Sequence, residues 1–387
     1  MTERRNPALV DAALDLHAAG EIEADTYVVD LDTVDANARA LAETAAASDV
    51  GLWFVAKQYG RNPLVTAAVA AHVPAAAAID VREVDGLVTA GARVGNVGHI
   101  TQVPVRRLPG VLRHEPDFVT VFDRGNLEAV AAASEDVGRV QRVLLKIASD
   151  PAGVYPGQEG GFEVADVRGV LEHADALPGV DVVGVTGFPC LLLDPTIGRP
   201  VGTATLDRVL AAAEVLRDAG ITPEISLPSH SSVSTIPVVA GLGGTWAEPG
   251  HALTGTTPEH VLRDDLREVP ALVYVSEVAQ LGGSTSVFGG GFYPRGRAES
   301  VLVACADGRR RGRLLDAPAE NIDYYRRFTW TGDGPAARVG DPAVMAFRTQ
   351  VFVTRSRVAV VSGVSSGRPV VRGLFDSQGR RLDGEPG

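Results

Sequence analysis

The sequence predicts an α/β fold in which a (β/α)8 TIM-type barrel is followed by a C-terminal all-β domain. Up to about residue 260, short apolar runs alternate with Ala-rich helical stretches, which is the pattern of βαβ units around a parallel sheet. Beyond that point, β-rich segments follow one another with turns between them and without helical spacers. A chain of 387 residues is long enough to form both domains.

The elements can be assigned in order along the chain. The first is a short amphipathic helix over residues 7–20, which Gly20 ends. Strands are predicted at residues 27–31, 52–56, 75–80, 94–98, 118–122, 141–147, 181–186, 223–227 and 245–248. Helical stretches between them include residues 35–47, 62–72, 124–134, 163–176 and 203–219. The C-terminal strands are predicted at residues 273–278, 300–304, 343–354, 358–362 and 369–375. A barrel of this type closes with eight strands, so one of the first nine has to lie elsewhere.

Composition excludes several classes of function. Lys plus Arg number 36 and Asp plus Glu number 48, so the net charge of −12 repels nucleic-acid phosphates and anionic lipids. Two cysteines, Cys190 and Cys305, cannot build a disulfide framework and fit a reducing compartment. The first residues lack an apolar signal core, and no segment is apolar enough to span a bilayer. We therefore expect a cytoplasmic protein without nucleic-acid or membrane partners.

Lys57 is the most informative residue of the sequence. It follows the apolar run 51–56 (GLWFVA) and precedes the polar turn 58–63 (QYGRNP), so it stands at the carboxyl end of a buried strand. In parallel α/β proteins this strand end is where ligands bind. Desolvation there favours the neutral amine, which can act as a Schiff-base nucleophile. On residue type alone, a lysine whose ammonium reaches into water is the more frequent case, so the other segments have to support the catalytic interpretation.

Three segments carry a resemblance to a known family: 54–63 (FVAKQYGRNP), 247–257 (AEPGHALTGTT) and 347–355 (FRTQVFVTR). Together with the strand-end lysine and the all-β domain, they resemble the fold-type III pyridoxal-phosphate enzymes, alanine racemases and ornithine or diaminopimelate decarboxylases among them, and most closely the YhfX-type branch. In this superfamily the first strand joins the β-domain. The resemblance therefore implies a barrel over residues 45–260 and a β-rich domain from residues 261–387 plus 1–44.

The resemblance implies pyridoxal 5'-phosphate as cofactor, bound through a Schiff base to Lys57. The cofactor-binding residues that it implies are Lys57, Tyr59, Ser231, Ser232, Glu248, Gly250 and His251. The phosphate needs hydroxyl and backbone N–H donors, which Ser231 or Ser232 and the turn at Gly250 and His251 would supply. A Ser-rich run after a strand is otherwise often only a helix N-cap. No metal ligands are expected.

Glu248 and Tyr293 carry the expected chemistry. Glu248 stands in a decarboxylase-type Glu-Pro-Gly segment, where alanine racemases have an arginine, and a carboxylate there would keep the pyridine nitrogen protonated. Tyr293 follows a Gly-rich run that resembles the racemase stretch carrying the second acid/base into the partner subunit's site. Tyr324 and Tyr325 are the alternative tyrosines. A surface glutamate and a packed aromatic are the plain alternatives for the first two.

The sequence also departs from the racemase pattern. Lys146 aligns with a lysine that some racemases carbamylate, but the arginine expected downstream is replaced by residues 155–161 (YPGQEGG). Where a histidine is expected, residues 187–190 read GFPC, and Cys190 is expected to be a buried, inert thiol. Cys305 does not lie in a decarboxylase-like setting. We therefore expect that the substrate is not held as free alanine is held in those racemases.

We therefore expect a cytoplasmic homodimer with shared active sites that racemises or epimerises a small-molecule amino acid, with Lys57 and Tyr293 as the two bases. Decarboxylation or elimination on the same fold is the first alternative. A pyridoxal-phosphate carrier without turnover is another, but the small carriers of this fold lack a β-domain. A class I aldolase using Lys57 without cofactor would leave the Ser-rich and Glu-Pro-Gly segments unexplained.

Overall fold

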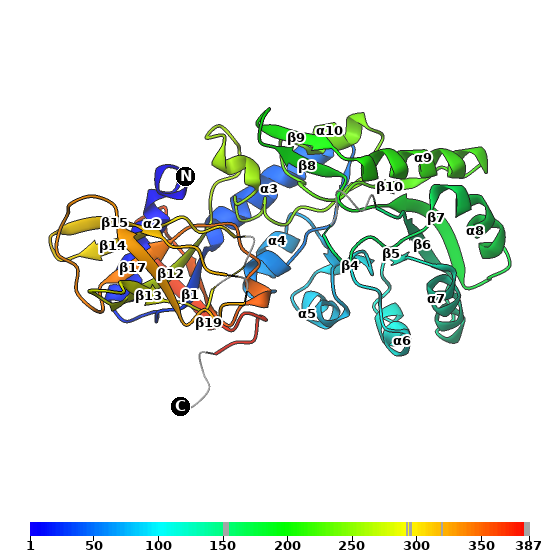
Figure 1. The fold of residues 1–387 in the computed structure, drawn as a ribbon. Helices are drawn as coiled ribbons and strands as arrows, with labels where there is room; N and C mark the ends of the chain where they lie inside the picture. Colours follow the sequence, from blue (N-terminus) through cyan, green and yellow to red (C-terminus); the bar gives the residue numbers. More distant parts are fainter. Residues whose placement is uncertain (150–154, 292, 294–295, 319, 383–387) are drawn as a thin grey trace. The chain divides into compact units, whose positions relative to one another are not determined.

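The computed structural model of the chain describes residues 1–149, 155–291, 293, 296–318 and 320–382, and its elements are labelled in Figure 1. The chain divides into two compact units. Unit 1 comprises residues 1–37, 57–68 and 253–387, and unit 2 comprises residues 38–56 and 69–252. The chain passes between the units at four points, two of which lie within the helices α3 (Leu31–Ala47) and α4 (Pro63–Ala70).

Unit 2 is the α/β part of the chain. Its strands are β2 (Gly51–Leu52), β3 (Ala75–Ala78), β4 (Arg93–Val97), β5 (Phe118–Val121), β6 (Gln141–Lys146), β7 (Val180–Thr186), β8 (Leu191–Asp194), β9 (Arg199–Gly202), β10 (Glu224–Ser226) and β11 (Trp246–Ala247). Its helices are α5 (Val84–Thr89), α6 (Leu108–Leu112), α7 (Arg124–Asp136), α8 (Val167–Ala174), α9 (Ala204–Asp218) and α10 (Ile236–Gly241), with 3-10 turns η2 (Val81–Glu83), η3 (Val105–Arg107) and η5 (Val164–Asp166).

Eight parallel strands of unit 2 form a nearly closed barrel. Their order is β2-β11-β10-β7-β6-β5-β4-β3, and the two edge strands meet at an isolated bridge between Phe54 and Ala76. There the Phe54 N–H donates to the Ala75 carbonyl at 3.0 Å, and the Ala77 N–H donates to the Phe54 carbonyl at 2.9 Å. Figure 1 shows α5 to α9 on the outside of these strands. The predicted barrel class is thus confirmed.

Aromatic rings fill one end of the barrel interior. Trp53 stacks on Trp246 with ring centroids 4.3 Å apart, and Phe118 packs against both rings. Glycines leave the space for the indoles, since a Cβ at Gly95 would lie 2.1 Å from the Trp53 ring and one at Gly51 would lie 2.3 Å from Trp246.

The strand predicted at 52–56 is wrong in length. Regular pairing covers only Gly51–Leu52, and the chain then bonds separately to its two neighbours.

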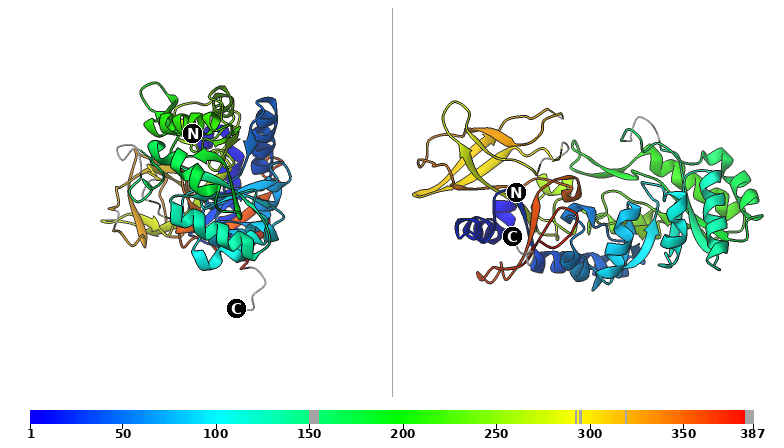
Figure 2. Two further views of the ribbon diagram at one scale, coloured as in Figure 1. Left: turned by 90° about the vertical axis from the view of Figure 1, so that its right-hand side faces the viewer. Right: turned by 90° about the horizontal axis from the view of Figure 1, so that it is seen from below.

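Unit 1 contains a mixed sheet, in which one neighbouring pair of the described strands is parallel and the other pairs are antiparallel. Its strands are β1 (Thr26–Asp30), β12 (Leu272–Gln280), β13 (Ser286–Phe288), β14 (Ser300–Cys305), β15 (Gly308–Leu314), β16 (Tyr325–Trp330), β17 (Pro342–Met345), β18 (Arg357–Ser362) and β19 (Val370–Phe375). Its further elements are α1 (Thr2–Arg5), α2 (Pro7–Ala18), η1 (Lys57–Tyr59), η6 (Pro258–Val261) and η7 (Val351–Val353). The sheet order is β13-β16-β15-β14-β17-β12-β1-β18-β19, and Figure 2 shows its yellow and orange strands from below. The first predicted strand, β1, pairs with β12 and β18 of this sheet and with no barrel strand.

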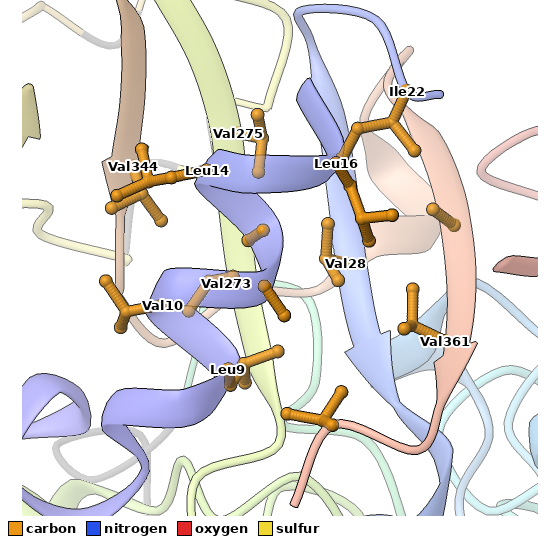
Figure 3. Close-up of a cluster of buried hydrophobic side chains, with 14 of the residues drawn as sticks. Leu9, Val10, Leu14, Leu16, Ile22, Val28, Val273, Val275, Val344 and Val361 are labelled. Atoms are coloured by element: carbon orange, nitrogen blue, oxygen red, sulfur yellow. The ribbon is translucent and has the colours of Figure 1, made fainter. Parts of the chain in front are cut away.

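Helix α2 packs its apolar side on this sheet (Figure 3). Its start is fixed by Pro7 in the first turn and by the Asn6 side chain, which accepts the Leu9 N–H at 3.1 Å. Gly20, with a φ of +74°, lies just beyond its end, as the sequence predicts. The buried contact joins Leu9, Val10, Leu14 and Leu16 to Val28, Val273, Val275, Val344 and Val361.

Three other features differ from the prediction. Strands β15 and β16 were not expected, because the run of arginines from Arg309 to Arg313 lacks apolar alternation. The strand predicted at 343–354 ends at Met345, and residues 351–353 form the turn η7 instead. The hairpin β8–β9 interrupts the stretch between β7 and α9. Within the described residues, none of the helices is both long and apolar enough to cross a membrane.

Candidate active site

The carboxyl end of the barrel brings together Ser231 and Glu248, which follow different strands. Ser231 lies in the turn after β10, and Glu248 follows β11 directly. The Glu248 N–H donates to the Ser231 hydroxyl at 2.9 Å, and both residues are buried. Burying a carboxylate is unfavourable unless other groups compensate its charge, which marks Glu248 as a site residue.

The Ser-rich turn is held by its own side chains. The Ser232 hydroxyl lies 2.9 Å from the Ser234 hydroxyl and 3.1 Å from that of Thr235, and the Thr235 hydroxyl donates to the His230 carbonyl at 2.6 Å. Just before it, Ser229 and His230 have backbone φ angles of +82° and +49°, which residues other than glycine rarely adopt. Such backbone strain is most often retained at ligand-binding turns.

A hydrogen bond in unit 2 connects the Glu-Pro-Gly turn to the segment that precedes Lys57. The Val55 N–H donates to the Pro249 carbonyl at 2.9 Å. Gly250 is buried and His251 is half-buried in the same turn. The chain then continues through Ala56 to Lys57, so the lysine follows the barrel strand whose neighbour carries Glu248.

His99 is a site residue that the sequence analysis missed. It lies two residues beyond β4, is fully buried, and its Nδ1 is 3.9 Å from Glu248 Oε1. Its ring meets the Phe188 ring edge-on at 5.9 Å. Gly98 allows this placement, since its φ is +93° and a Cβ there would lie 2.7 Å from the Thr120 carbonyl oxygen. The strand-end rule that identified Lys57 would also have identified His99.

Lys146, the last residue of β6, is buried and forms a second polar feature of this barrel end. Its Nζ donates to the carbonyls of Gln158 at 3.2 Å and Gly160 at 2.5 Å. Burial lowers the pKa of Lys146 to about 8, while the charges of Cys190 and Glu159 act in the opposite direction. The carbonyls of Gln158 and Gly160 both accept hydrogen bonds from this amine. This environment therefore suits a lysine that is not carbamylated.

Cys190 is buried as expected. Burial first, and then the charge of Glu248, raises the pKa of its thiol, which favours the protonated and unreactive form.

Lys57 and Lys146 are the only two lysines in the sequence. A reaction that needs a lysine amine therefore has only two candidate side chains in this sequence.

Within unit 1, Lys57 and Tyr59 lie in the short 3-10 turn η1, which packs against η7. Lys57 is half-buried, whereas Tyr59 is fully buried with its hydroxyl 3.4 Å from that of Thr66. The following turn is tight, because Gly60 and Arg61 have φ angles of +72° and +55°. This geometry ends the apolar segment at Lys57 and starts helix α4.

Tyr293 is half-buried in unit 1, and its carbonyl accepts the Gly296 N–H at 2.7 Å. The Gly-rich run before it packs on polar side chains. A Cβ at Gly290, whose φ is +129°, would lie 1.9 Å from the Asp25 carboxylate, and one at Gly291 would lie 2.5 Å from the Tyr274 ring. Tyr324 and Tyr325 are exposed by 62% and 44%, so they are less sheltered than Tyr293.

Asp25 organises this region of unit 1. Its carboxylate accepts from the Tyr274 hydroxyl at 2.9 Å and from the Ser356 hydroxyl at 2.5 Å. Burial raises its pKa, and these two hydrogen bonds offset part of that effect. The Tyr27 hydroxyl donates to the Gly291 carbonyl at 2.7 Å. The Gly-rich run that leads to Tyr293 is therefore rigidly supported up to Gly291.

The residues of the barrel end fit pyridoxal phosphate. A phosphate dianion requires hydroxyl and backbone donors, and the buried Ser231 and Ser232 provide hydroxyls beside the Gly250 turn. A protonated pyridine nitrogen requires a carboxylate, and Glu248 is bonded through its own amide to Ser231. Among the described residues, no cluster of three or more His, Cys, Asp or Glu side chains could hold a metal ion.

Comparison with known proteins gives two family matches. Residues 29–258 match the family described as the alanine racemase N-terminal domain, and residues 273–371 match the YhfX-like C-terminal domain. The chain is 37% identical to the protein YhfX of Escherichia coli K12 over 385 residues, which is 98% of each chain.

Two solved structures show the same fold. Alanine racemase of Clostridium difficile 630 in complex with cycloserine aligns with a TM-score of 0.64 and 16% identity, over 92% of this chain and 99% of that chain. Diaminopimelate decarboxylase of Helicobacter pylori in complex with L-lysine aligns with a TM-score of 0.67 and 12% identity, over 94% and 95%. The fold is thus shared by enzymes that catalyse different reactions.

Proposed function

Because the chain belongs to the alanine racemase-fold family with a YhfX-like C-terminal domain, we propose that it is a pyridoxal-phosphate enzyme that racemises or epimerises an amino acid. One observation carries the proposal. The backbone N–H of Glu248, whose carboxylate is buried, donates to the hydroxyl of Ser231 in the buried Ser-rich turn at the carboxyl end of the barrel. This bond places a carboxylate and hydroxyls on neighbouring strand ends, and these groups suit the pyridine nitrogen and the phosphate, the two ends of this cofactor.

The proposed roles follow from the chemistry of each side chain. Ser231, Ser232 and the amides of Gly250 and His251 hold the phosphate, and Tyr59 supports the cofactor. Glu248 holds a proton on the pyridine nitrogen. When bound, the cofactor withdraws electrons from the substrate and makes its α-proton acidic. Lys57 would bind the cofactor covalently and, once the substrate amine has displaced it, its freed amine would remove the α-proton from one face.

Tyr293 would donate its own phenolic proton to Cα from the other face. Each positioned acid or base contributes roughly 10²–10⁴-fold to the rate. We also propose that the protein is a homodimer in which Tyr293 serves the partner's site, and that it works in the cytoplasm. The substrate is held differently from free alanine in the racemases, because residues 155–161 contain no arginine to hold the substrate carboxylate as in the racemase pattern.

The test uses the small number of lysines. Protein reconstituted with pyridoxal phosphate and reduced with borohydride should carry a pyridoxyl group on the peptide containing Lys57. Because Lys146 is the one other lysine, the label has two possible side-chain positions. Lys57→Ala should lose the label, and Lys146→Met should keep it. A wild-type protein that takes up no cofactor would contradict the proposal, and so would a label on Lys146.

Decarboxylation or elimination is the second candidate function. Glu248 favours it, because a protonated pyridine nitrogen also stabilises the carbanions of these reactions. An amino-acid panel analysed by chiral chromatography and by release of CO₂ and ammonia separates the two functions. Inverted stereochemistry without CO₂ or ammonia is the outcome that supports racemisation.

A further inference from the structure

His99 occupies the centre of the barrel's carboxyl end. In the barrel order, β4 and β11 are separated by β2 and β3 in one direction and by four strands in the other. His99, beyond β4, nevertheless reaches Glu248, beyond β11, with 3.9 Å between Nδ1 and Oε1. It also contacts Phe188, which follows β7. One imidazole therefore links three strand ends across the barrel.

The imidazole of His99 and the carboxylate of Glu248 interact in a buried environment. The side chains of His99 and Glu248 are 1% and 4% exposed, so water screens their interaction weakly. A buried carboxylate of this kind is stable as an anion when a cation or donor faces it. Cys190 is not a cation, since burial and the charge of Glu248 raise the pKa of its thiol and keep it neutral. Its S–H donates to the Gly187 carbonyl at 3.3 Å. Lys146 donates to the carbonyls of Gln158 and Gly160.

We propose that His99 is a positioning residue for Glu248: its imidazolium keeps the carboxylate ionised and fixes where it points. This rests on the proposed function, in which Glu248 is the partner of the pyridine nitrogen. The distance of 3.9 Å is that of an ion pair and is too long for a direct hydrogen bond. The edge-on contact with Phe188 and the conformation of Gly98 hold the ring in place. His99 thus acts on the cofactor only through Glu248.

The first test uses cofactor-free protein. With histidine labelled at Cε1, the eight histidines give separate NMR signals, and His99 is identified by its loss in His99→Gln or His99→Asn. In Glu248→Gln the carboxylate charge is gone, so the titration midpoint of His99 should fall by at least about one pH unit. His173, whose Nε2 lies 2.9 Å from Glu128 on the surface, is the internal control and should not move. A change in His99 below about 0.3 units overturns the proposal.

The second test measures cofactor binding and its pH dependence. His99→Gln should bind pyridoxal phosphate with a dissociation constant within a few-fold of wild type, because the Ser-rich turn is intact. The pH at which the bound cofactor changes its absorbance spectrum should shift by at least about one unit, an effect that loss of packing alone would not cause. His173→Gln should leave the spectrum unchanged. An unshifted pH profile in His99→Gln overturns the proposal.

The two tests separate this inference from the proposed function. Wild-type protein that binds no pyridoxal phosphate would end the proposed function, whatever His99 does. Wild-type protein that binds the cofactor but shows no response of His99 to Glu248→Gln would end the inference alone. Coupling of His99 to Glu248 together with a shifted spectrum supports both.

Discussion

Glu248 and Lys146 are the two buried ionisable residues on which a single substitution can decide a question of chemistry. Glu248→Gln keeps the size and the hydrogen-bonding ability of the side chain but removes its charge. We expect pyridoxal phosphate to bind with little change, because in our proposal the phosphate is held by other residues. Turnover on the identified substrate should slow by roughly 10–100-fold, the loss that corresponds to one charged hydrogen bond of about 1.5–3 kcal/mol.

Steady-state kinetics and cofactor titration check this prediction together. Glu128→Gln is a suitable control, because Glu128 lies in α7 and its carboxylate pairs on the surface with His173 Nε2 at 2.9 Å. The control should behave like wild type. A Glu248→Gln variant with an unchanged kcat would show that Glu248 is not the partner of the pyridine nitrogen.

Lys146 should make stability depend on pH in the alkaline range. Its pKa falls from 10.5 to about 8 because it is buried, so the folded chain binds this proton more weakly than the unfolded chain. Between these two values the unfolded chain holds the proton and the folded chain does not, so the free energy of unfolding rises with pH. The rise is on the order of 3 kcal/mol and lies between about pH 8 and 10.5.

Urea denaturation at pH 7 and pH 10.5 measures this effect against Lys146→Met. The variant lacks the titrating amine, so the difference in unfolding free energy between wild type and variant should move in favour of wild type as the pH rises. A difference that is the same at both pH values would show that Lys146 is not held in a desolvated site.

At the scale of single residues, a sequence can indicate a candidate site residue when the pattern around one strand end is sufficient to select it. Lys57 was predicted because it directly follows an apolar strand, and Glu248 because its Glu-Pro-Gly segment resembles that of the decarboxylases. In the structure the Glu248 amide donates to the Ser231 hydroxyl. His99 was missed although it obeys the same rule. Its partners follow β11 and β7, and sequence gives no distance between strand ends that are far apart in the chain. The hydrogen bonds of Lys146 were likewise not predictable, since they end on backbone carbonyls.

At the level of elements, the Gly-rich run before Tyr293 makes a specific prediction about stability. Gly290 and Gly282 have φ angles of +129° and +101°, so an alanine at either position strains the backbone. They differ in their surroundings, because a Cβ at Gly290 would lie 1.9 Å from the Asp25 carboxylate and one at Gly282 would have no atom within 4 Å. Gly290→Ala should therefore lose at least about 2 kcal/mol more than Gly282→Ala.

Thermal and urea unfolding of the two variants provide the comparison. The extra loss reflects displacement of Asp25, which is bonded to Tyr274 and Ser356. Equal losses in the two variants would mean that only backbone strain matters at both positions and that Asp25 moves aside freely.

Most elements were predictable, and the exceptions share physical causes. Apolar runs such as Phe118–Val121 and Val180–Thr186 match predicted strands within one residue at each end, because both are largely buried. Strand β15 escaped prediction because its side chains are mostly arginines, two of which pair with Asp11 and Glu3 of the N-terminal helices. Strand β2 is shorter than predicted, since after Leu52 the chain bonds to Ala75 and Pro249 instead of to one strand.

At the scale of the whole molecule, the order of the strands could be predicted only through family resemblance. The sequence predicts nine strands before residue 260, and alternation alone cannot say which of them leaves the barrel. The sheet order assigns β1 to the sheet of unit 1, antiparallel to β12 and parallel to β18. Pairings of this kind join Tyr27 to Tyr274 and Val358, which are hundreds of positions away along the chain. No local pattern contains that information.

The final prediction concerns the assembly of two chains. We propose that Tyr293 serves the site of the partner subunit, so each site needs Lys57 from one chain and Tyr293 from the other. Lys57→Ala and Tyr293→Phe should each be inactive as purified dimers. In a mixed dimer, one of the two sites regains both native side chains, so its activity should be roughly half that of wild type.

Differently tagged variants, co-expressed and purified through both tags, give the mixed dimer without its parents. A mixed dimer of Lys57→Ala with itself under two tags is the control and should remain inactive. If Tyr293 acts within its own chain, every site of the mixed dimer lacks one residue, and no activity returns. That outcome, or full activity of Tyr293→Phe alone, would place the second base elsewhere, with Tyr324 and Tyr325 the next positions to substitute. Recovery of activity only in the hybrid would mean that dimerisation completes the catalytic site.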